Sequence, residues 1–125
     1  MPFVADIVKV EAPSQAAAGD TVIVDVHVKN LAADYSYIAV TGSYDSNLVS
    51  FQFDYLDVGP QETVIFRGWF IMPSKKVRVH LWSWYWDGNT WQIKDKGDDY
   101  EYRDISLTEL MAEFSDMRIS NFIKV

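Results

Sequence analysis

The sequence from Val77 to Trp91 reads V-R-V-H-L-W-S-W-Y-W-D-G-N-T-W and holds four of the five tryptophans of the chain. Its odd positions, Val77 to Tyr85, carry apolar or small residues, as expected for the buried side of a β-strand. Its even positions place a row of rings on the opposite side, a side far too aromatic to serve only as a water-facing surface: His80, Trp82, Trp84 and Trp86. The pattern predicts a strand over 77–86 that ends in an Asp87-Gly88 hairpin turn.

Other segments show the same two-residue alternation between turn residues. The clearest is Thr21 to Asn30, in which every second residue is a valine from Val22 to Val28. We predict the remaining strands at residues 5–11, 36–44, 48–55, 63–72 and 100–107, with the return strand of the hairpin beginning at Thr90-Trp91. Because the strands are short and regularly spaced, the sequence predicts an all-β antiparallel sandwich of about seven strands.

The C-terminal segment has a different pattern. Ser106 and Glu109 have the spacing of a helix capping box, and apolar residues then recur at helical intervals: Leu107, Leu110, Met111, Phe114 and Met117. The final residues, 118–125, alternate like a strand and include Ile119 and Phe122. We therefore predict a sandwich domain at 1–107 and an extension at 108–125 made of a short amphipathic helix and a strand-like tail.

Composition restricts the partners. The chain has 125 residues, no cysteine and a formal net charge of −7. This charge argues against nucleic-acid binding and against docking to anionic membranes. No run of apolar residues is long enough for a transmembrane helix, so membrane insertion is not expected. The first residues lack the pattern of a secretory signal, which leaves the localisation unknown.

The residues do not predict catalysis or a cofactor. His27 and His80 both fall on the outward side of their strands, and no other pattern supplies a nucleophile with a base. The best candidates for calcium ligands lack the strict order of a dedicated calcium loop: Asp87, Asn89, Asp95, Asp98 and Asp99. We expect a protein that is not an enzyme and interpret these five residues as turn residues.

Three short motifs, in this order, resemble a known family. They are A-G-D-T-V at 18–22, L-x-V-G-P-x-E-T-V at 56–64 and F-x-M-P-S at 70–74, followed by the tryptophan-rich hairpin. Together they resemble bacterial and archaeal immunoglobulin-like domains of the CARDB type, over residues 5 to about 107. The resemblance implies an immunoglobulin-like sandwich of seven strands that serves as a spacer, adhesion or assembly module.

Three hypotheses explain the aromatic side of 77–86. It docks on another protein, in self-association or a larger assembly, with a virion or an extracellular surface as the favoured setting. It stacks on a carbohydrate, with Trp82, Trp84 and Trp86 as a linear platform. Or the C-terminal extension folds back over it. The candidate interface or ligand-binding residues are Trp69, His80, Trp82, Trp84, Trp86, Trp91, Leu110, Phe114, Ile119 and Phe122.

Overall fold

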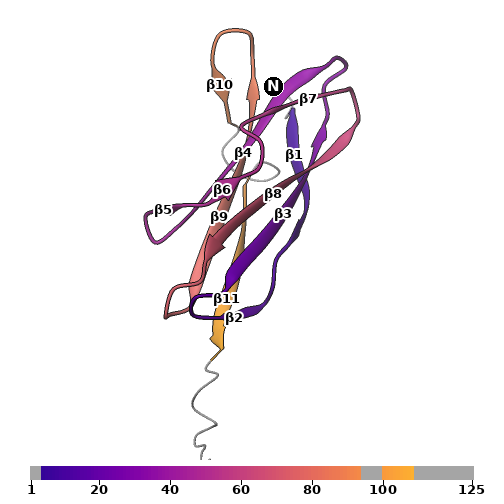
Figure 1. The fold of residues 1–125 in the computed structure, drawn as a ribbon. Helices are drawn as coiled ribbons and strands as arrows, with labels where there is room; N and C mark the ends of the chain where they lie inside the picture. The colour runs from indigo at the N-terminus through magenta and orange to yellow at the C-terminus, as the bar shows by residue number, and fades with distance from the viewer. Residues whose placement is uncertain (1–3, 94–99, 109–125) are drawn as a thin grey trace, which may run out of the picture.

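The computed structural model describes residues 4–93 and 100–108, which form two β-sheets packed face to face (Figure 1). The first sheet has the strand order β1-β3-β8-β6, with β1 at Ala5–Glu11, β3 at Thr21–Asn30, β6 at Ser50–Phe51 and β8 at Thr63–Ile71. The second sheet has the order β2-β11-β9-β4-β5, and its central strand is β9 at Val77–Trp86. Its other strands are β2 at Gln15–Ala17, β4 at Ser36–Tyr44, β5 at Asn47–Leu48 and β11 at Tyr100–Thr108.

Two further short strands extend the second sheet. β7 at Leu56–Val58 pairs with the beginning of β4, and β10 at Trp91–Gln92 pairs with the end of β9. The ladders are antiparallel except for β2, which runs parallel to the end of β11. The prediction of an all-β sandwich is confirmed.

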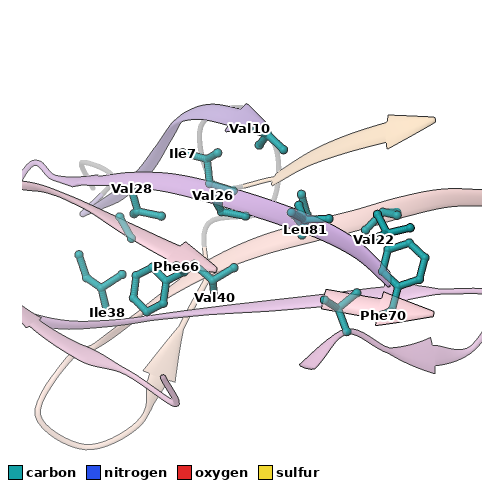
Figure 2. Close-up of a cluster of buried hydrophobic side chains, with 14 of the residues drawn as sticks. Ile7, Val10, Val22, Val26, Val28, Ile38, Val40, Phe66, Phe70 and Leu81 are labelled. Atoms are coloured by element: carbon teal, nitrogen blue, oxygen red, sulfur yellow. The ribbon is translucent and has the colours of Figure 1, made fainter. Parts of the chain in front are cut away.

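The core lies between the sheets and is built from the inward side of each strand. Figure 2 shows its side chains gathered between the two layers, and they include Val26 of β3, Phe66 of β8 and Leu81 of β9. The valines of β3 and the odd positions of β9 are buried, as their alternation predicts. In β1 the register shifts between Ile7 and Lys9, so Ile7 and Val10 both face inward. Such a β-bulge explains why the two buried residues are three positions apart.

The predicted strand at 48–55 is wrong. The chain turns at Asp45 and Ser46, both with positive φ, and pairs in the second sheet as β5. It then crosses to the first sheet as β6 and returns to the second as β7. Phe51 therefore packs against the core, while Tyr55 is exposed. Phe51 thus lies in β6 of the first sheet, whereas Tyr55 lies in the connection between β6 and β7, so the two side chains do not share the face of one strand.

The predicted start of a helix at Leu107 is also wrong, because Leu107 and Thr108 continue β11 and pair with Ala16 and Ala17 of β2. The described residues contain no helix. The remainder of the expected helix, the strand-like tail and their candidate residues Leu110, Phe114, Ile119 and Phe122 lie outside the described residues.

Candidate functional site

An aromatic surface covers the outer side of the second sheet. Strand register places Tyr100 of β11 beside Trp82, Tyr102 beside His80, and Trp91 of β10 beside Trp86. Tyr37 of β4 and Tyr55, which precedes β7, complete the surface at the end where β9 finishes. We call this set the aromatic face: Tyr37, Tyr55, His80, Trp82, Trp84, Trp86, Trp91, Tyr100 and Tyr102.

The rings near the beginning of β9 contact one another and are fixed by polar contacts. His80 stacks with Trp82 and with Tyr100 at 5.9 Å between ring centroids. The Nδ1 atom of His80 lies 2.6 Å from the hydroxyl of Tyr100. Partial burial raises the pKa of Tyr100 above its ordinary value. This half of the face is therefore a packed cluster and not a set of independent rings.

Arg78 closes this end of the face. Its guanidinium lies 4.2 Å from the ring centroid of Tyr102, and it donates to both carboxylate oxygens of Asp104, at 2.7 and 3.1 Å. The hydrogen bond from Arg78 holds the pKa of Asp104 below its usual value. Arg78 is thus already engaged by a carboxylate and an aromatic ring.

The other half of the face contains two hollows. The first, of about 370 Å³, is lined by Ala39, Thr41, Asp54, Tyr55, Trp84 and Trp91. The second, of about 290 Å³, is lined by Tyr37, Tyr55, Trp86 and Trp91. Tyr55 and Trp91 are walls of both hollows. The Nε1 atom of Trp84 donates to the Thr41 hydroxyl at 2.8 Å, which fixes this indole at the first hollow.

The turn after β9 is held by Asp87. Its Oδ1 accepts from the backbone nitrogens of Asn89 at 2.8 Å and Thr90 at 2.9 Å, while Oδ2 accepts from the Gln92 side chain at 2.9 Å. These donors, Thr90 first, lower the pKa of Asp87. Asp87 thus acts as a turn acceptor. Its predicted calcium partners Asp95, Asp98 and Asp99 lie outside the described residues.

The site residues predicted from the sequence divide into separate groups. His80, Trp82, Trp84, Trp86 and Trp91 share the aromatic face. Trp69 does not, because β8 pairs with β3 and points this indole outward from the first sheet, on the opposite side of the molecule.

Sequence reasoning missed several residues of the face. Tyr100 and Tyr102 were detectable from the alternation of the return strand. Ala39, Thr41 and Tyr37 required the pairing of β4 with β9, and Asp54 and Tyr55 required the crossing between sheets.

The described part of the chain gives little support for a metal site, a membrane-spanning helix or a serine nucleophile. Within residues 4–93 and 100–108, no three histidine, aspartate or glutamate side chains converge well enough to hold a metal ion. The same residues include no helix long and apolar enough to cross a bilayer. Ser83, which lies between two tryptophans in sequence, is buried and donates to the Ala5 carbonyl at 2.9 Å, so it serves packing.

Solved structures share this architecture. The CARDB domain of the PF1109 protein from Pyrococcus furiosus, crystallised in complex with di-metal ions, aligns with a TM-score of 0.62 at 18% identity, covering 86% of this chain and 97% of that one. A solution structure of the same domain aligns with a TM-score of 0.59 at 17% identity, covering 83% and 95%. Native alpha-2-macroglobulin from Escherichia coli aligns at 0.57 and 17% identity, covering 84% of this chain and 17% of that one.

No family model matches the sequence, and no curated protein matches it. At these identities the likeness shows the fold alone. The chain has the fold of a CARDB-type immunoglobulin-like domain, as the sequence motifs predict.

Proposed function

We propose that this protein is a non-catalytic assembly module and that the aromatic face makes its contact with another protein. The observation that carries the proposal is the continuity of the face, whose rings extend across the paired strands β4, β9, β10 and β11. Contiguous exposed apolar surface of this kind marks interaction sites, and tryptophan and tyrosine are favoured interface anchors.

The polar contacts within the face support binding over catalysis. Apart from Asp54, the side chains of the face that could move a proton or hold a substrate are paired with one another: Arg78 with Asp104, Asp87 with Gln92, and His80 with Tyr100. Such contacts fix the rings before a partner arrives and lower the entropy lost on binding. They also engage Arg78, Asp87 and Gln92, the groups that would assist a carbohydrate.

We propose a second copy of the chain as the partner, because the charges along β9 are complementary end to end. Exposed Lys76 marks the beginning of β9, where the charges of Arg78 and Asp104 offset each other, while Asp54, Asp57 and Asp87 surround its end. In a two-fold pair with antiparallel faces, the basic end of each copy meets the acidic end of the other. The C-terminal extension after Thr108 is proposed to add to the same contact.

Light scattering of the full chain over a range of concentrations tests this proposal. We expect self-association that is lost in the double variant Tyr55→Ser, Trp86→Ser and kept in the matched control Trp69→Ser. All three side chains are partly exposed, so truncation should spare the fold. A chain ending at Thr108 shows how much the extension contributes. A full chain that stays monomeric at every concentration overturns the proposal.

A further inference from the structure

The first hollow differs from the rest of the aromatic face because its rings surround a space. Of the rings that line it, Tyr55 and Trp91 lie 6.2 Å apart between centroids, and their planes are inclined by 51°. A pyranose stacks best on rings that form one flat platform. Inclined rings instead present their faces and edges to a compact group held among them.

Asp54 is the one charged side chain among the described residues that line this hollow. Asp54 is exposed at its lining, and within the described residues its side chain makes no hydrogen bond or ion pair. The Thr41 hydroxyl, an uncharged polar group of the lining, already accepts a hydrogen bond from the indole N–H of Trp84. A carboxylate beside aromatic ring faces attracts a cation twice, through its charge and through the negative face of the rings, and it repels an anion.

We propose that the hollow lined by Ala39, Thr41, Asp54, Tyr55, Trp84 and Trp91 binds a cationic side chain, lysine or arginine, presented by a protein partner. The small side chain of Ala39 opposite Trp84 leaves room for the stem of the incoming residue. Which residue supplies the cation depends on the proposed function: in a pair of copies, it is Lys76 of the second copy. The site itself rests on the hollow alone.

The test uses small probes on the full chain at a concentration where it is monomeric. Tetramethylammonium is titrated while the indole N–H signals are followed by NMR, with tert-butanol as a neutral probe of similar shape. We expect tetramethylammonium to shift the signals of Trp84 and Trp91 in a saturable manner and to leave that of Trp69 unchanged. Tert-butanol should give a much smaller response.

Two variants define the chemistry. Asp54→Asn should weaken tetramethylammonium binding by about threefold to tenfold. Glu11→Gln removes the same charge from the first sheet and should leave binding unchanged. Tyr55→Leu keeps an apolar side chain but removes a ring and should also weaken binding. Melting curves of each variant confirm that the fold is retained.

Several results overturn this inference. They are equal responses to tert-butanol and tetramethylammonium, no saturable response, or unchanged affinity in Asp54→Asn. A soluble polysaccharide that shifts the Trp84 and Trp91 signals and displaces the cation identifies the hollow as a glycan site instead. Self-association without cation binding rejects this inference and leaves the proposed function standing. Cation binding by a chain that never self-associates rejects Lys76 as the source and leaves the site standing.

Discussion

Asn30 lies fully buried where β3 ends, and its side chain holds two connections in place. Nδ2 donates to the carbonyls of Val58 at 2.8 Å and Asp34 at 3.0 Å, and Oδ1 accepts from the backbone nitrogen of Ala32 at 2.8 Å. These contacts tie the first sheet to β7 of the second, the strand that follows Tyr55. A residue that alternation describes only as a strand end therefore supports one wall of the site.

Replacing Asn30 with leucine should lower the free energy of unfolding by about 3 kcal/mol, because it leaves buried backbone groups without partners at nearly constant volume. Urea denaturation measures the change. The exposed Asn47 offers a matched control, and Asn47→Leu should cost less than about 0.5 kcal/mol. Equal stabilities for the two variants would contradict the assigned role of Asn30.

Gly68 of β8 is needed because Phe51 of β6 packs directly on its backbone. A Cβ atom at this position would lie 2.7 Å from Cε1 of Phe51, closer than van der Waals contact allows. We expect Gly68→Ala to destabilise the protein by about 1–2 kcal/mol through overpacking. The same substitution in a Phe51→Leu background should cost less, which a double-mutant cycle by thermal unfolding measures. Additive effects would exclude the clash.

At the scale of elements, the turn from β9 to β10 positions Trp91, and hydrogen bonds that the Asp87 carboxylate accepts hold this turn. Gly88 has a φ of 102°, a backbone conformation that residues with a side chain rarely adopt. The Asp87 carboxylate accepts hydrogen bonds from the backbone nitrogens of Asn89 and Thr90. Asp87→Ala should speed amide hydrogen exchange at Asn89 and Thr90. Asp57→Ala, an exposed carboxylate of β7, serves as the control and should leave both rates unchanged. Unaltered exchange in Asp87→Ala would show that pairing with β9 alone holds the turn.

Acid should weaken the ladders that carry cross-strand ion pairs. The hydrogen bond from Arg67 lowers the pKa of Asp25, and the one from His27 lowers the pKa of Glu11. A carboxyl whose pKa is depressed by folding contributes stability above its unfolded value, near 4, and loses it as the pH falls through the folded value. We expect the melting temperature to fall below about pH 4. Asp25→Asn should make the melting temperature fall less steeply with falling pH. An unchanged slope would show that other groups cause the fall.

The sequence predicts these elements only as far as the alternation of apolar and polar residues along a strand allows. Alternation reports which side chains of a strand share a face, and it predicts β3 and β9 with their buried sides. It does not report the sheet to which a strand belongs. Trp69 has the same outward pattern as Trp84, yet the pairing of β8 with β3 places it on the other side of the molecule. The hollows combine residues from β4, β9, β10 and the segment before β7, so they depend on pairings between distant segments.

For the whole molecule, the distribution of charge predicts how association responds to salt. The basic and acidic ends of the aromatic face are exposed, so added salt screens their attraction over roughly 8 Å at physiological ionic strength. We expect high salt to weaken self-association of the full chain, measured by analytical ultracentrifugation. Lys76→Gln should reduce this salt dependence, while the control Lys9→Gln on the first sheet should not. Association that strengthens with salt would show that burial of the aromatic rings, and not attraction between charges, drives the contact.

The path of the chain also determines how the sandwich resists a pulling force applied to its two ends. β1 begins at one end, where the Ala5 carbonyl accepts a hydrogen bond from Ser83 of β9, and β11 leaves at the other end beyond Val77 (Figure 1). Tension between these two points acts along the strands, so it slides β1 against β3 and β11 against β9 instead of peeling them apart. The ladder hydrogen bonds then bear the load together, and rupture requires several of them to break at once. The parallel contact of β2 with the last residues of β11 adds a clamp where the force arrives.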